Sequence, residues 1–220
     1  MRGHLSRLLL FFALLGLGGC QNSAPRVEST DWELFRIKST VDGEVYERLS
    51  LFLAAVDDEG VEDLDQLYLY HPESRLYWEL TVEEWEEKNR EGREWIGCSS
   101  FEGIDRLPRG EYRYILIDRA GDRSEESLFL DQPLATGEEE EFFPSLRRKG
   151  DILLLETGGE EAFIVAEAAE GRVLAGYRSR DERIPLGSLG EPGERESNDW
   201  YLFVYREAFG WYAGSGPYRF

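Results

Sequence analysis

Apolar and polar residues alternate along much of the chain after Trp32, which is the pattern of half-buried β-strands. The first two runs, 34–38 and 45–56, flank Asp42-Gly43, a dipeptide that favours a tight hairpin turn. Further runs with the same period predict more strands. They lie at 67–70, 76–80, 111–118 and 127–130.

One segment, 82–91, departs from this pattern and predicts a short helix. Thr81 and Glu84 have the spacing of a capping box, and Val82 and Trp85 would share one face of the helix. A helix of this length is marginal alone, so we expect Trp85 to pack against a sheet.

Residues 105–131 carry the most specific strand pattern. A Leu-Pro-x-Gly turn at 107–110 leads into a tyrosine-bearing alternating strand, and an Asp-x-Ala-Gly turn at 118–121 precedes a closing strand. This arrangement resembles the late hairpin of immunoglobulin-like and fibronectin type III sandwiches. The resemblance implies a mainly β fold, with an immunoglobulin-like antiparallel β-sandwich over 32–131. It extends to architecture only, because the disulfide and partner tryptophan of antibody domains are absent.

A run of four glutamates at 138–141 is typical of a solvated segment, and we place a connector at 132–147. The remaining residues, 148–220, are expected to form a smaller antiparallel β unit. Apolar runs separated by glycine turns predict a three-stranded meander within it. Its strands would be 152–155, 162–166 and 173–177.

The chain ends in an aromatic-rich segment. Its first run, 200–205, is apolar on both faces, which is typical of a central strand, and the aromatic residues at 209–212 are expected to continue it. Aromatic side chains are rigid and amphipathic and therefore dominate contact surfaces. The candidate binding surface comprises Trp200, Tyr201, Phe209, Trp211 and Tyr212. The alternative is that these side chains simply fill the core.

The first twenty residues have the pattern of a secretory signal. Arg2 and Arg7 precede an uncharged apolar run that is too short to span a bilayer as a stable helix. The run ends in Leu17-Gly18-Gly19-Cys20, which resembles the lipobox of bacterial lipoprotein precursors. The resemblance implies that Cys20 is diacylated and becomes the new N-terminus.

The same resemblance divides the N-terminal region into a removed signal peptide, 1–19, and a lipidated tether, 20–31. Two or more acyl chains hold a protein firmly to a membrane, whereas one chain binds only marginally. Gln21 follows the cysteine in place of the aspartate that commonly retains such proteins in the inner membrane. The expected location is therefore the cell envelope, at the outer membrane.

Charge narrows the possible partners. The formal net charge of −20 becomes −22 once Arg2 and Arg7 are removed with the signal. A surface this acidic repels phosphate backbones, which excludes nucleic acid as a partner. It also repels an anionic bilayer, so the acyl chains must provide the membrane attachment. The two cysteines, Cys20 and Cys98, leave Cys98 as a lone buried thiol if Cys20 is acylated. A Cys20–Cys98 disulfide is the alternative and would contradict lipidation.

Catalytic and metal-binding motifs are missing from the sequence. His71 is the only histidine outside the signal and is expected in an exposed turn, while Cys98 has no neighbouring histidine to activate it. The acidic stretch 57–65 lacks EF-hand spacing and is interpreted as a solvated turn. We therefore expect no enzyme activity, no cofactor and no metal.

The resulting hypothesis is a lipid-anchored envelope protein with a non-catalytic binding or assembly role, whose partner is a protein or a glycan. The alternative is an envelope hydrolase that acts on a glycan through paired carboxylates, because 45 acidic residues leave such a pair open.

Overall fold

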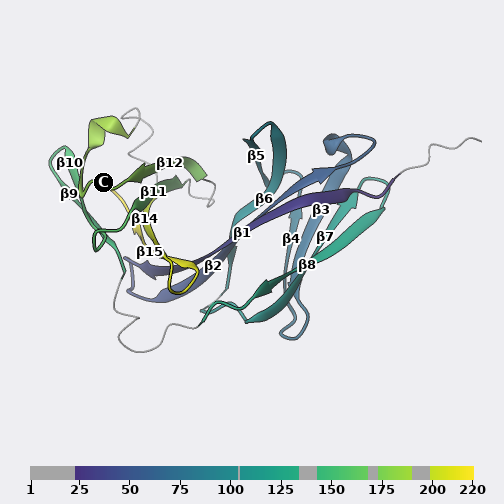
Figure 1. Cartoon of the computed structure of the whole chain (residues 1–220), viewed down its shortest axis with the longest axis horizontal. Helices are drawn as coiled ribbons and strands as arrows, with labels where there is room; N and C mark the ends of the chain where they lie inside the picture. Colours follow the sequence, from purple (N-terminus) through teal and green to yellow (C-terminus); the bar gives the residue numbers. More distant parts are fainter. Residues whose placement is uncertain (1–22, 104, 134–142, 168–172, 190–198) are drawn as a thin grey trace, which may run out of the picture.

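The computed structural model of the protein describes residues 23–103, 105–133, 143–167, 173–189 and 199–220. These residues form three β-sheets of eight, four and three strands, here called sheets A, B and C (Figure 1). Helical structure in this part is confined to short 3₁₀ turns such as η1 (Val61–Asp63) and η3 (Leu186–Ser188). The prediction of a mainly β protein is confirmed. No helix in the described ranges is long and apolar enough to cross a bilayer.

Sheet A runs through the whole molecule in the order β12-β11-β14-β15-β1-β2-β6-β5. Its neighbours pair antiparallel, except that β1 and β15 pair parallel. The bounds are β1 Arg26–Ser39, β2 Val45–Val56, β5 Glu86–Arg90, β6 Arg93–Glu102, β11 Ala162–Glu167, β12 Val173–Ser179, β14 Asp199–Arg206 and β15 Trp211–Tyr218.

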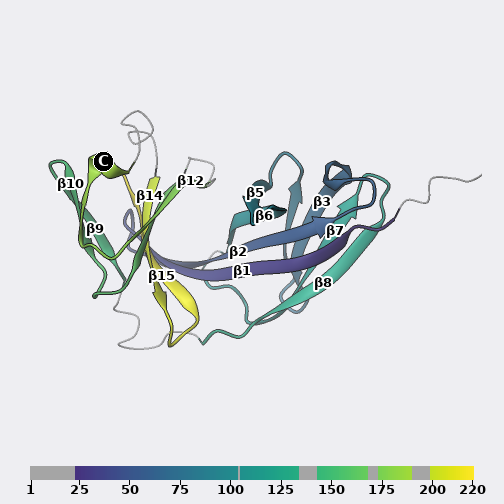
Figure 2. The same cartoon turned by 45° about the horizontal axis from the view of Figure 1, so that its top comes forward.

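The long hairpin of β1 and β2 connects the two halves of the molecule (Figures 1 and 2). The predicted turn at Asp42-Gly43 is confirmed, with Gly43 at a φ of 81° and the Asp42 carboxylate accepting from the Glu44 amide at 3.0 Å. Strand β1 begins earlier than expected, because residues 26–31 also pair with β2, with a shift of register between Val27 and Ser29. That part of the predicted tether is therefore strand.

The first half is a β-sandwich. Strands β1, β2, β6 and β5 of sheet A face sheet B, whose order is β4-β3-β7-β8. Sheet B consists of β3 Leu64–His71, β4 Leu76–Thr81, β7 Gly110–Asp118 and β8 Arg123–Leu130. The core between the sheets contains Leu49, Leu51 and Leu53 from β2, as their alternation requires. The hairpin of β7 and β8 lies where the sequence pattern predicted it.

The prediction of a helix at 82–91 is wrong. Thr81 and Glu84 do form the capping contact, with the Thr81 amide donating to the Glu84 carboxylate at 3.0 Å, but the turn stops there. Residues 86–90 form β5, which joins β6 through a two-residue turn in which Glu91 and Gly92 both have positive φ. Pairing with β6 satisfies the backbone of 86–90, which has no apolar stripe to pack as a helix. Trp85 is buried against the core, as expected.

The second half packs sheet C against the other end of sheet A. Sheet C has the order β13-β10-β9, with β9 Ser145–Lys149, β10 Ile152–Glu156 and β13 Arg183–Pro185. The predicted three-stranded meander is wrong, because β10 pairs within sheet C while β11 and β12 pair within sheet A. Most of the predicted connector, 134–142, lies outside the described residues, and β9 already includes 145–147.

The two halves have separate cores on the same face of sheet A, one under sheet B and one under sheet C. The parallel pairing of β1 with β15 joins them into one sheet. The opposite face of sheet A is therefore the surface that neither small sheet covers.

Candidate functional site

Strand alternation divides the predicted aromatic surface between the two faces of sheet A. Trp200 and Trp211 are only 2% and 3% exposed and belong to the two cores. The prediction that they line a binding surface is wrong. Successive residues of a strand point to opposite faces of the sheet, and these two tryptophans point to the face that sheets B and C cover. The chain also turns after β14, with the Phe209 and Gly210 amides donating to the Arg206 carbonyl. Phe209 lies in this turn, stacked on Trp211 and half-buried.

Tyr201 and Tyr212, the other two candidates, lie on the uncovered face. They are part of a cluster that we call the aromatic face. Every strand that contributes to it belongs to sheet A, so this cluster has no second sheet over it. The aromatic face consists of Phe35, Ile37, Tyr46, Phe163, Val165, Tyr201, Phe203, Tyr205 and Tyr212.

Two glycines on β15 create the space in which the central rings lie. A Cβ on Gly214 would overlap the Phe203 ring, and one on Gly216 would overlap the Tyr201 ring. The rings therefore lie flat over bare backbone, almost coplanar with each other at an interplanar angle of 10°. These glycines carry the signal that the sequence analysis missed, because aromatic residues on one strand often cover glycines on the next.

The outer rings of the aromatic face contact one another closely. Phe35 stacks on Tyr212 at a centroid distance of 5.0 Å, and Phe163 meets Tyr212 edge-on at 5.5 Å. Tyr205 also lies 5.0 Å from Tyr212 and remains 45% exposed. Phe35, Phe163 and Tyr212 are half-buried, so this group presents apolar ring edges and phenolic hydroxyls beside the exposed Tyr205, a composition that suits contact with another molecule.

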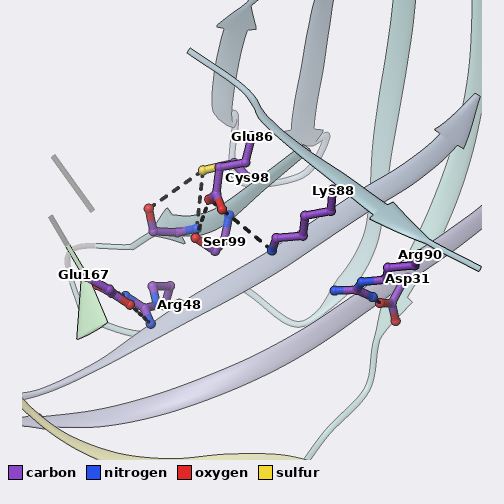
Figure 3. A network of polar contacts seen from close by, with 9 residues as sticks. Asp31, Arg48, Glu86, Lys88, Arg90, Cys98, Ser99 and Glu167 are labelled. Atoms are coloured by element: carbon purple, nitrogen blue, oxygen red, sulfur yellow. Dashed lines mark hydrogen bonds and ion pairs between the residues drawn. The ribbon is translucent and has the colours of Figure 1, made fainter. Parts of the chain in front are cut away.

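A buried ion pair between Arg48 and Glu167 (Figure 3) lies beside the central rings of the aromatic face. Arg48 on β2 donates two hydrogen bonds to Glu167 on β11, at 2.9 and 3.1 Å, and both side chains are about 4% exposed or less. The guanidinium also lies 5.4 to 5.7 Å from the ring centroids of Phe35, Tyr201 and Phe203. The pair therefore connects the two halves across the rings.

The pKa values of this pair and of two neighbouring groups are all raised. Burial raises the pKa of Glu167, although the Arg48 guanidinium opposes this shift. Burial alone would lower the pKa of Arg48, but the Glu167 carboxylate outweighs it and raises this pKa. Burial, with the adjacent Asp31 carboxylate, raises the pKa of Glu33 above its ordinary value. Burial, with Glu33, also raises the pKa of Tyr212 to about 12. The tyrosine is thus a neutral hydrogen-bonding group at neutral pH.

The same uncovered face is polar in the first half of the molecule. Glu86 accepts from the Ser99 amide at 2.7 Å and pairs with Lys88 at 3.6 Å, while Arg90 pairs with Asp31 (Figure 3). Lys88 Nζ also lies 3.4 Å from the centre of the Phe52 ring on β2.

The two residues considered for catalysis, His71 and Cys98, both pack within the fold. His71 is 2% exposed, so the prediction that it lies in an exposed turn is wrong. Its ring packs on Tyr112, and its nitrogens lie within hydrogen-bond distance of Ser74 and the Arg109 carbonyl. Cys98 is a free, half-buried thiol packed beside the core, and burial raises its pKa. Cys20 lies outside the described residues.

Carboxylates do gather at one groove, of about 540 Å³, beside the β1–β2 turn. It is lined by Asp42, Glu44, Glu102 and Asp105 together with Tyr46. Within the described residues, no group of three or more histidine, cysteine, aspartate or glutamate side chains is arranged to hold a metal ion. The arrangement that stands out chemically is the aromatic face, which is suited to binding.

Comparison with known proteins adds little. No protein-family model matches the chain, and no curated protein matches it. Among solved structures, the chain is similar to Tp47, the 47-kilodalton lipoprotein of Treponema pallidum, with 16% sequence identity and a TM-score of 0.34. The alignment covers 87% of this chain and 51% of that chain, so this chain spans about half the length of Tp47. A likeness this weak supports no conclusion about function.

Proposed function

We propose that the protein is a lipid-anchored component of the bacterial cell envelope that binds a partner, without catalysis, through the aromatic face of sheet A. The observation that carries the proposal is the outer part of this face: half-buried Phe35 and Phe163 and the 45% exposed Tyr205 all contact Tyr212, whereas Tyr201 and Phe203 are buried. Isolated exposed apolar residues are ordinary on a protein surface, but a contiguous patch indicates an interaction site.

Two further features support the proposal. The lipobox sequence ending at Cys20 supports attachment at the outer membrane through acyl chains. The strand orders β1-β2-β6-β5 and β4-β3-β7-β8 support an immunoglobulin-like sandwich, since they match the ABED and CFG arrangement with one added edge strand. Tyr112 near the start of β7 donates to the Pro108 carbonyl at 3.0 Å, the bond of a tyrosine corner. Sandwiches of this type commonly serve as binding modules.

The anchor is tested by intact-mass analysis of the protein from native membranes. An N-terminal, acylated Cys20 is expected, and Cys20→Ser should move the protein from the membrane to the soluble fraction. Cys98→Ser is the matched control and should stay in the membrane. An unmodified N-terminus elsewhere, or a Cys20–Cys98 disulfide, would contradict the proposal.

The binding role is tested by titrating purified protein in detergent against washed envelopes of its own cells. Tyr205→Ser should weaken binding about tenfold, because burying an exposed tyrosine in an interface contributes on the order of 1–2 kcal/mol. Tyr77→Ser is the control, since Tyr77 is 67% exposed on the outer side of sheet B. Equal binding by the two variants would refute a role for the aromatic face.

The class of partner follows from pretreating the envelopes. Loss of binding after protease digestion indicates a protein, and loss after digestion with a peptidoglycan hydrolase indicates a glycan. We place no weight on the alternative of a glycan hydrolase, because no observation favours a catalytic carboxylate pair.

A further inference from the structure

Strand β12 (Val173–Ser179) is one of the two end strands of sheet A, and among the described residues nothing pairs with its outer side. Native edge strands are normally protected by charges, prolines or bulges. The other end strand, β5, follows this rule, since four of its five residues, Glu86, Glu87, Lys88 and Arg90, are charged. Strand β12 carries a single charge, Arg178, and its Leu174 side chain is 45% exposed.

Both sides of β12 offer apolar surface to an added strand. Gly176 pairs with Val165 and Arg178 with Phe163, so the exposed Arg178 lies on the side of the aromatic face, while the exposed Leu174 lies where the register shifts between Ala166 and Glu167. Arg178 itself lies over the Phe163 ring at 4.8 Å. An incoming strand would therefore continue the aromatic face by one more row of side chains.

On the other side, a groove of about 230 Å³ separates the edge of sheet A from the edge of sheet C. Its walls come from β12 and from residues 183–189 around β13 and η3. Tyr177, Ile184 and Leu189 form its apolar part, and the Tyr177 hydroxyl bonds to the Leu189 carbonyl. The alternate side chains of an added strand would enter this groove.

Charge at this edge differs from the rest of the molecule. Residues 173–189 hold three arginines against one aspartate and one glutamate, a net charge of +1 in a chain whose net charge is −20. Arg178 and Arg183 both line the groove, and both are exposed. The local field therefore favours a segment with acidic residues, in contrast to the acidic surface elsewhere.

We propose that β12 binds an extended segment of a partner protein as an additional strand of sheet A, with alternating apolar side chains and acidic residues that face Arg178 on one side of the sheet and Arg183 on the other. Backbone hydrogen bonds to the free edge would supply affinity, and the two side-chain rows would supply specificity. The inference deepens the proposed function, because it names a protein as the partner and an edge as a point of contact.

The test uses a display library of random twelve-residue peptides, selected on the purified protein. Selected peptides should show alternating apolar residues with acidic residues, and should slow hydrogen exchange of alternate amides in 174–178. Peptides without this pattern, or protection at β5 or β8 in place of β12, would overturn the proposal.

Gly176→Lys is the decisive variant. A Cβ at Gly176 meets nothing within 4 Å, so the fold tolerates a side chain there, while a lysine on an edge strand opposes pairing. Binding of the selected peptides should fall at least tenfold. Ser127→Lys, which places the same charge on the edge strand β8 of sheet B, should leave binding unchanged. Equal loss in both variants would show a general charge effect and refute the edge site.

Exchanging charges between Arg183 and the peptide tests the preference for acidic residues. A gain in binding of the changed peptides cannot come from a misfolded protein. Arg183→Glu should weaken binding of the selected peptides and strengthen binding of versions in which lysine replaces their acidic residues. Unchanged preference would contradict the role of Arg183.

The experiments can distinguish failure of the β12 proposal from failure of the proposed function of the aromatic face. If Tyr205→Ser abolishes envelope binding while Gly176→Lys leaves peptide binding intact, the proposed function stands and the edge proposal fails. Protection of β12 by soluble chitin oligosaccharides, and not by peptides, would assign the edge to a glycan and overturn the inference.

Discussion

The uncovered face of sheet A is polar in the first half of the molecule and aromatic in the second. In both halves the opposite face carries a core, covered by sheet B or sheet C. On the uncovered face, the first half places ion pairs such as Arg90–Asp31, with cations over the Phe52 and Trp95 rings, whereas the second places Tyr205 and Tyr212 in contact with each other. In both halves a smaller sheet covers the opposite face, but only the second half gathers a cluster of aromatic rings on the uncovered face. Packing against a second sheet therefore does not explain them, whereas the proposed binding role would account for the exposed Tyr205.

The largest expected effect comes from the buried pair at the centre of the aromatic face. Arg48→Met leaves Glu167 as an unpaired buried carboxylate and should lower the free energy of unfolding by about 3–5 kcal/mol, measured by urea denaturation. Arg90→Gln breaks the exposed Arg90–Asp31 pair and should cost about 1 kcal/mol or less.

A double variant separates lost charge pairing from lost packing. Arg48→Met combined with Glu167→Leu should recover most of the stability, since apolar groups of similar volume often replace a buried ion pair without loss. If Arg48→Met costs no more than Arg90→Gln, the two halves do not differ in the way described.

The two faces of β14 offer the next comparison. Trp200→Ala should cost about 3–5 kcal/mol in chemical denaturation, because it opens a cavity in the core under sheet C. Tyr205→Ala, on the open face, should change stability by about 0.5 kcal/mol or less. Similar losses at both positions would show that the aromatic face is also core, and would weaken the binding proposal.

The positions of the Phe203 and Tyr201 rings depend on the glycines beneath them, and replacing such a glycine should have a smaller effect on stability. Gly214→Ala places a methyl group where Phe203 lies and should lower the free energy of unfolding by about 1–3 kcal/mol. Gly176→Ala is the control, because its methyl group meets nothing within 4 Å, and it should cost nothing measurable. A neutral Gly214→Ala would mean that Phe203 moves freely.

The smallest effect is a pH dependence at the junction of the two halves. The pKa of Glu33 is raised in the folded protein, so the folded state holds its proton more tightly than the unfolded chain does. Its contribution to stability is therefore lost as pH rises from about 4.5 through the folded pKa, and stays lost above it.

Glu33→Gln removes this loss and should raise Tm more at pH 7 than at pH 4, measured by scanning calorimetry. Glu94→Gln, at an exposed position of β6, supplies the baseline. A Tm gain for Glu33→Gln that is the same at both pH values would contradict the assigned cause.

The sequence predicted local structure well where local chemistry decides it. The alternation of 45–56, the turn at Asp42-Gly43 and the turns around β7 and β8 correspond to strands and hairpins as expected. It also identified 200–205 as a strand apolar on both faces. It misassigned 82–91, because the capping contact of Thr81 and Glu84 is compatible with a single turn as well as with a helix.

What the sequence determined by itself is the periodicity of each strand and, with it, which residues share a face. Tertiary structure decided which face is covered. Trp200 and Tyr201 are neighbours with the same pattern in the sequence, and only the tertiary structure places Trp200 under sheet C and Tyr201 beside the Arg48–Glu167 pair on the opposite face. The same holds for His71, which contacts Arg109 from another strand. Such contacts depend on strands far apart in the chain, and no local pattern encodes them.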